Sequence, residues 1–79
     1  MLEQILEHYC DESFLKMDGF NDCIIGVEED SMRLIYSEKK ILEKLEQTMR
    51  PLDALEYFGF NIARCYMGEK TPIISYDNF

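Results

Sequence analysis

A proline in the middle of the chain divides its longest helix-type pattern into two helices. The apolar positions at helical spacing before it are Ile41, Leu42, Leu45 and Met49, and those after it are Leu55, Phe58, Ile62 and Tyr66. Ser37 is placed to cap the first helix. Pro51 is tolerated in the first turn of a helix, and it biases Arg50 away from helical backbone angles. The sequence therefore predicts a helix hairpin, with helices over about residues 38–48 and 51–67.

Three short runs rich in β-branched and aromatic residues are typical of strands, over about residues 23–27, 32–36 and 72–76. A polar stretch joins the first two runs, which predicts a hairpin. Because the strands are too few for a sandwich, a helix layer on a sheet is the simplest packing. We therefore predict an α+β fold, in which a three-stranded antiparallel sheet packs against the helix hairpin and the last strand lies beside the first.

An extra helix is predicted at the start of the chain, from apolar residues at positions i, i+3, i+4 and i+7. These residues are Leu2, Ile5, Leu6 and Tyr9. A chain of 79 residues has room for one domain, over residues 1–79. No apolar run approaches the ~20 residues that span a bilayer, and the first residues lack the basic region of a signal peptide. We therefore expect a soluble, intracellular protein that does not bind membranes.

Charge is distributed unevenly along the chain. The net charge is −8, and residues 1–30 carry all of it, with nine Asp or Glu and one Lys. Residues 31–79 hold seven acidic and seven basic residues. A field of one sign on part of a small surface steers basic partners toward it, and it disfavours the phosphate backbone of nucleic acids as a ligand. The N-terminal third is therefore the candidate interaction face, with a plain solvated surface as the alternative.

The sequence shows no arrangement typical of a catalytic or metal site. Acid–base or nucleophilic catalysis needs paired carboxylates in a cleft or a nucleophile oriented by histidine, and His8 is the only histidine. Asp18 and Asp22 fit turn-shaping hydrogen bonds better than a calcium loop, whose ligand spacing they do not match. The three cysteines form no CxxC pair and are predicted to be free thiols; they are Cys10, Cys23 and Cys65. We predict a protein that is not an enzyme and that binds no metal or cofactor.

Several segments, taken together, resemble a family of small uncharacterised bacteriophage proteins. They are DGFNDCIIGV over residues 18–27, the pair Ile35-Tyr36, ALEYFGFNI over residues 54–62 and GEKTPI over residues 68–73. The similarity covers about residues 18–74 and implies a phage protein in the cytoplasm of an infected bacterium, with no settled activity for the family. The chain differs from the family pattern at Arg50-Pro51, where a Ser or Thr helix cap is usual, and at Gly59, where a larger residue is usual.

A small acidic phage protein without catalytic groups is predicted to be a binding protein. We expect an inhibitor or modulator of a host or antiphage-defence protein, whose carboxylates take the place of nucleic-acid phosphates on a basic surface. Phe20 or Tyr9 would act as an apolar anchor. The residues predicted to bind this basic partner are Asp11, Glu12, Asp18, Phe20, Asp22, Glu28, Glu29 and Asp30.

Two other functions stand as alternatives. One is a small-ligand or nucleotide-binding accessory module of phage metabolism, which would use the polar positions Tyr36, Glu56 and Asn61. The other is a structural accessory protein that folds fully only as an oligomer, with a homodimer as the simplest case.

Overall fold

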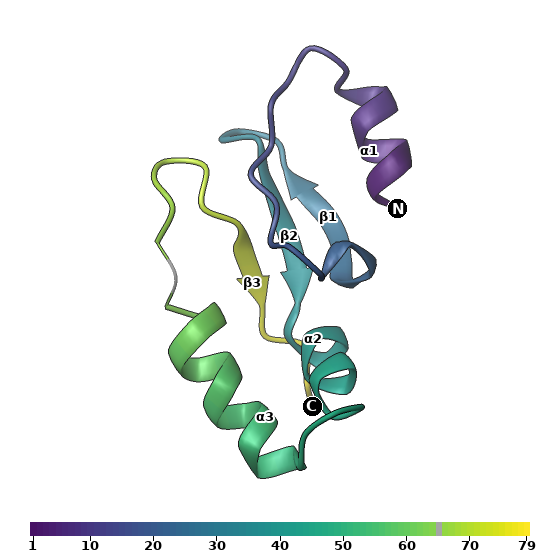
Figure 1. The fold of residues 1–79 in the computed structure, drawn as a ribbon. Helices are drawn as coiled ribbons and strands as arrows, with labels where there is room; N and C mark the ends of the chain where they lie inside the picture. Colours follow the sequence, from purple (N-terminus) through teal and green to yellow (C-terminus); the bar gives the residue numbers. More distant parts are fainter. Residues whose placement is uncertain (65) are drawn as a thin grey trace.

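The structure is a computed structural model that describes residues 1–64 and 66–79, and it consists of a mixed three-stranded sheet with helices around it (Figure 1). In chain order the elements are α1 (Leu2–His8), η1 (Asn21–Cys23), β1 (Ile24–Glu28), β2 (Arg33–Ser37), α2 (Glu38–Leu45), α3 (Pro51–Tyr57), η2 (Phe58–Ile62) and β3 (Ile73–Ser75). The short η1 is a 3-10 turn, and η2 is a π-helical continuation of α3. The predicted α+β class is confirmed. The molecule is elongated, 40 × 23 × 22 Å, with the β1–β2 turn at one end and the start of α3 at the other.

β2 is the central strand of the sheet, antiparallel to β1 and parallel to β3. The prediction that the last strand lies beside the first in an antiparallel sheet is therefore wrong. Because α2 and α3 connect β2 to β3 as a crossover, the chain enters both strands from the same end of the sheet. The central position of β2 agrees with its burial, since Leu34 and Tyr36 are both 0% exposed.

The β1–β2 hairpin agrees with the sequence prediction, but it contains a bulge. The paired residues are Ile24 with Tyr36 and, after the bulge, Gly26 with Ile35. One extra residue of β1 lies between these pairs and has no partner in β2. In the turn, Met32 has a φ of 52°, a left-handed angle that is uncommon outside glycine. Cys23, which the prediction places in the first strand, belongs to η1 instead.

Ser37 caps α2, as the sequence predicts. Its Oγ accepts a hydrogen bond from the Lys40 N–H (3.1 Å), which satisfies one of the free donors of the first turn. The same hydroxyl donates to Asp77 Oδ2 (2.6 Å), and Asp77 Oδ1 accepts from the Lys39 N–H (3.0 Å). The Lys39 N–H and then the Ser37 hydroxyl lower the pKa of Asp77. Residues after β3 are thus tied to the start of α2.

The two helices of the hairpin end earlier than predicted. α2 ends at Leu45, and α3 begins at Pro51 after Arg50, whose backbone is extended (φ −69°, ψ 154°). The α-helical part of α3 ends at Tyr57. The predicted end of this helix passes through Cys65, which lies outside the described residues.

The second helix continues as a π-helical turn, and its buried residues differ in part from those predicted. In η2 the Ala63 N–H donates to the Phe58 carbonyl, five residues earlier (2.8 Å). The buried residues of α3 and η2 are Ala54, Phe58 and Ile62. Leu55 and Tyr66, predicted to be buried, are 50% and 80% exposed. Leu55 lies in the α-helical part, one residue after the buried Ala54, and Tyr66 lies beyond the end of η2, where the predicted helix does not continue.

The N-terminal segment packs on the sheet through few residues. α1 buries Ile5, whereas Leu6, predicted to be on the same apolar face, is 39% exposed. Farther along, the Met17 N–H donates to the hydroxyl of Tyr36 (2.8 Å), which fixes the loop against β2. Among the described residues, the buried apolar core consists of Ile5, Cys23, Ile24, Leu34, Tyr36, Ile41, Leu42, Leu45, Ala54, Phe58 and Ile62.

Candidate functional site

Five of the predicted partner-binding carboxylates lie where the chain leaves α1 and where β1 turns into β2. We call this group the acidic tip; its members are Asp11, Glu12, Glu28, Glu29 and Asp30. The Tyr9 hydroxyl donates to Glu29 Oε2 (3.0 Å), and the Glu12 N–H donates to the Tyr9 carbonyl (3.0 Å). The hydrogen bond with Glu29 raises the pKa of Tyr9. These contacts bring two acidic segments together that are about twenty residues apart in sequence.

Glu28 shapes the hairpin turn from within the acidic tip. Its Oε1 accepts from the hydroxyl (2.6 Å) and the N–H (3.2 Å) of Ser31, and its Oε2 accepts from the Asp30 N–H (2.6 Å). The Ser31 hydroxyl, followed by the Asp30 N–H, lowers the pKa of Glu28. Because three donors surround this carboxylate, its oxygens are already hydrogen-bonded within the turn. Glu28 therefore contributes to partner binding only through its charge.

A lysine compensates part of the acidic tip. Lys70 Nζ lies 3.4 Å from Glu12 Oε2 and donates to the Ser13 carbonyl (2.7 Å). The same ammonium lies 5.8 Å from the centroid of the Phe14 ring. The carboxylates of the tip that remain exposed without a cationic neighbour in the described part of the chain are those of Asp11, Glu29 and Asp30.

The other three predicted residues lie at the opposite end of β1, around η1. A strand of five residues spans ~13 Å at ~3.3 Å per residue, so this group is separate from the acidic tip. Lys44 Nζ lies 2.8 Å from Asp22 Oδ1 and 6.0 Å from the centroid of the half-buried Phe20 ring. Asp18 is exposed in the loop just before η1. The structure therefore divides the eight predicted residues into two groups.

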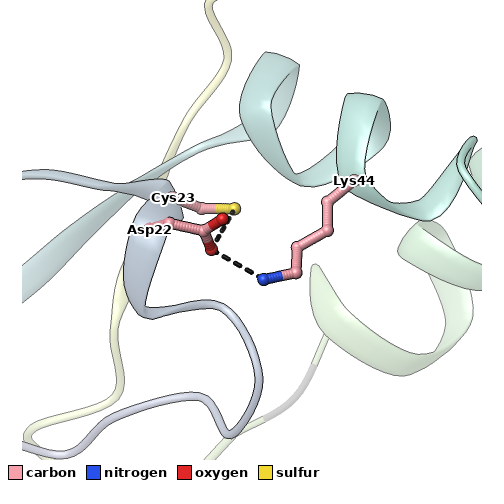
Figure 2. A network of polar contacts seen from close by, with 3 residues as sticks. All are labelled: Asp22, Cys23 and Lys44. Atoms are coloured by element: carbon pink, nitrogen blue, oxygen red, sulfur yellow. Dashed lines mark hydrogen bonds and ion pairs between the residues drawn. The ribbon is translucent and has the colours of Figure 1, made fainter.

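Asp22, Cys23 and Lys44 form a small polar network between η1 and α2 (Figure 2). These residues also help to line an open depression. The depression has a volume of about 300 Å³, and its other lining residues are Lys40, Glu43 and Gln47. The hydrogen bond with Lys44 lowers the pKa of Asp22, and the same bond raises the pKa of Lys44. Two acids and two lysines balance one another here, so the lining has no net charge with which to select an anion or a cation.

The thiol in this network is not set up as a nucleophile. Cys23 is 1% exposed, and its Sγ lies 3.8 Å from Asp22 Oδ1. Burial, and then the negative charge of Asp22, raises the pKa of Cys23 to about 11. A reactive cysteine needs the opposite shift, because the thiolate is the nucleophile. The geometry around Cys23 is that of a core side chain.

The residues predicted for the alternative ligand site do not come together. Tyr36 is fully buried in β2, and its hydroxyl already accepts a hydrogen bond from the Met17 N–H. Glu56 and Asn61 are exposed on α3 and η2, and Asn61 Nδ2 donates to the Tyr57 carbonyl of its own helix (3.3 Å). A ligand therefore has no route to all three side chains at once.

Sequence reasoning did not assign roles to Lys44, Lys40 or Lys70. Lys40 and Lys44 are four residues apart in the predicted helix, which places them on one side of it, so their common position could have been found. Their partner Asp22 could not, because it comes from a distant segment. Lys70 lies in a loop, and no periodic pattern connects it with Glu12.

Within residues 1–64 and 66–79, no group of three or more His, Cys, Asp or Glu side chains is placed to hold a metal ion. None of the helices described there is long and apolar enough to cross a membrane.

Comparison with known proteins finds no matching family model, no similar curated protein and no similar solved structure. The resemblance to small phage proteins therefore stays a prediction.

Proposed function

We propose that the protein is a small acidic phage protein that inhibits or modulates a host or antiphage-defence protein in the bacterial cytoplasm. In this proposal the acidic tip binds a basic surface of that protein, which normally receives nucleic acid. The carboxylates of Asp11, Glu29 and Asp30 take the place of phosphates.

The observation that supports this proposal is the junction between Tyr9 and Glu29. It holds the segment after α1 against the hairpin turn, so that carboxylates from two separate acidic stretches share one end of an elongated molecule. Charges gathered in this way produce a stronger local field than the same charges spread over the surface. The group around η1 adds less, because Lys44 neutralises Asp22.

The test is a charge reversal at the tip in which the hairpin turn is left intact. Asp11→Lys combined with Asp30→Lys replaces two exposed carboxylates and retains Glu28. The wild type is used to capture its partner from phage-infected bacteria, and the affinity for that purified partner is then measured at low and high salt. Two lost ion pairs at up to ~1 kcal/mol each, with repulsion in their place, predict affinity lower by about tenfold or more.

A matched control reverses two carboxylates on α2. Glu43→Lys combined with Glu46→Lys changes the net charge by the same amount at the other end of the molecule. We expect this control to bind nearly as the wild type, and wild-type binding to weaken as salt is added. Equal losses in both double variants, or affinity that does not respond to salt, would contradict binding through the tip.

A further inference from the structure

Three large apolar side chains on α3 and η2 are left exposed. Leu52 is 68% exposed, Leu55 is 50% exposed and Phe60 is 76% exposed. The same segment buries Ala54, Phe58 and Ile62 in the core, so it is apolar on two sides. Single exposed apolar residues are ordinary, whereas a row of them on one helix marks an interaction surface.

The π turn brings Phe60 toward the side of the helix that carries Leu52. Each residue of an α-helix turns the chain by ~100°, and a π turn, with its hydrogen bonds between residues five apart, turns it by less. Phe60 lies inside η2 and is therefore rotated back toward the leucines. Gly59 lies beside it, and a Cβ built there would meet no atom within 4 Å, so the surface is open at that point.

Two charges on this segment, one near each end, are complementary to those of a second, antiparallel copy. Asp53 lies six residues before Gly59, and Arg64 lies five residues after it; both are exposed. When two copies of the segment cross near Gly59 about a two-fold axis, Asp53 of each copy approaches Arg64 of the other. The axis repeats this ion pair at both ends of the crossing, whereas Glu56, the other exposed charge between them, has no cation opposite it.

The acidic tip also favours pairing of two copies through α3 over pairing through other faces of the molecule. The tip and the start of α3 lie at opposite ends of the 40 Å long axis (Figure 1). Two copies joined through α3 keep their tips well beyond the ~8–10 Å over which salt screens charges. Contact through α1 or the hairpin would bring the like charges together.

We propose that α3 and η2 form the interface of a two-fold symmetric dimer of this chain. A standard protein–protein interface covers ~800 Å² on each partner, which is about one seventh of the 5534 Å² surface of this chain. One helix face with its flanks covers less than that. The dimer is therefore of the weak class that dissociates on dilution.

Sedimentation velocity over a dilution series tests the proposal. The wild type is expected to change from dimer to monomer as it is diluted. Asp53→Arg and Arg64→Asp, each made alone, place like charges opposite one another and are expected to raise the dissociation constant about tenfold. The double variant with both changes restores the pair in reversed order and is expected to dimerise nearly as the wild type.

Leu6→Ser is the matched control for exposed apolar surface, because Leu6 lies on α1 and is 39% exposed. It is expected to leave the dissociation constant unchanged, whereas Phe60→Ser abolishes the dimer. If the wild type stays monomeric at every concentration, the proposal is overturned, and the exposed apolar side chains are then a surface for a different protein. A dimer that tolerates Phe60→Ser, or that the double charge swap fails to restore, places the interface elsewhere and overturns it equally.

Discussion

Tyr36 is the residue that connects the N-terminal loop to the centre of the sheet. Its ring is fully buried in β2, and its hydroxyl accepts the Met17 N–H at 2.8 Å. Burial raises the pKa of Tyr36, so the hydroxyl stays neutral at physiological pH. The residue resembles a ligand-binding position when only the sequence is known, because a polar group at a strand end can face either way. The structure shows it as a structural acceptor for an otherwise unpaired backbone donor.

Tyr36→Phe is expected to destabilise the protein by roughly 1–2 kcal/mol, because the half-buried Met17 N–H loses its acceptor. The measurement is the free energy of unfolding from denaturant titration. Tyr57→Phe, at a tyrosine that is 42% exposed, is the control and is expected to change the free energy by less than ~0.5 kcal/mol. Equal effects of the two substitutions would mean that the hydroxyl of Tyr36 does not hold the loop.

At the scale of secondary-structure elements, α2 and the break after it were predictable from sequence and the path of α3 was not. Ser37 and Pro51 act locally, through one side-chain acceptor and one ring, so their neighbours decide the outcome. The π turn in η2 depends on which of Phe58, Gly59 and Phe60 packs into the core. A periodic pattern contains no signal for such a change of pitch. Leu55, in the α-helical part before it, lies at the edge of the buried face that Ala54 and Phe58 define, and spacing alone does not show which edge faces water.

Gly59→Ala is expected to stabilise the protein by ~0.5–1 kcal/mol. Gly59 has no left-handed backbone angle, and an added Cβ meets no atom within 4 Å, so alanine restricts the unfolded chain without strain. Gly68→Ala is the comparison, because Gly68 has a φ of 100° and alanine is strained there. Both are measured by denaturant unfolding in dilute protein. A destabilising Gly59→Ala would contradict the helical backbone of η2.

The strand order could not be read from the sequence for a related reason. The run around Ile24 lacks charge and proline, which favours a central position, yet β2 is central. The choice depends on whether the helix hairpin returns the chain beside β1 or beside β2. Contacts such as that of Arg33 Nη1 with the Thr71 carbonyl (3.3 Å), over 38 residues of sequence, belong only to the second arrangement.

For the whole molecule, the sequence predicted how much charge there is but not where it collects. The excess of acidic residues lies in the first thirty residues of the sequence. The hydrogen bond from Tyr9 to Glu29 explains why some of these acidic residues lie together at one end of the molecule. Lys44 neutralises Asp22 through a contact between distant segments, and Glu28 is hydrogen-bonded within its own hairpin turn. Those contacts reduce the predicted binding set to a smaller exposed group.

Stability is expected to fall on acidification because three carboxylates have lowered pKa values. The pKa values of Asp22, Glu28 and Asp77 all lie below their ordinary values, near 3.8 for Asp and 4.5 for Glu. The folded state therefore binds fewer protons than the unfolded state, and the stabilisation is complete above those ordinary values. It is lost as the pH falls through the lowered pKa values. Thermal unfolding at pH 7 and at about pH 3 measures this loss.

Asp77→Asn separates one contribution from the rest. Without its charge, the position holds the Lys39 N–H and the Ser37 hydroxyl less strongly, so the variant is less stable at pH 7. Because that contribution no longer titrates, the variant is expected to lose less melting temperature on acidification than the wild type. A variant that loses as much would show that Asp77 carries no part of the acid response.

The parallel pairing of β2 with β3 has a consequence for how fast the chain reaches its native state. The β1–β2 hairpin closes over a short turn, an event of microseconds for isolated hairpins. β3 must instead meet residues 38 positions earlier, as Ile73 meets Ile35, and it can do so only after the intervening helices have folded back. Loop-closure entropy opposes such distant encounters, and rates fall as contact order rises. Docking of β3 is therefore the step expected to limit the rate of folding.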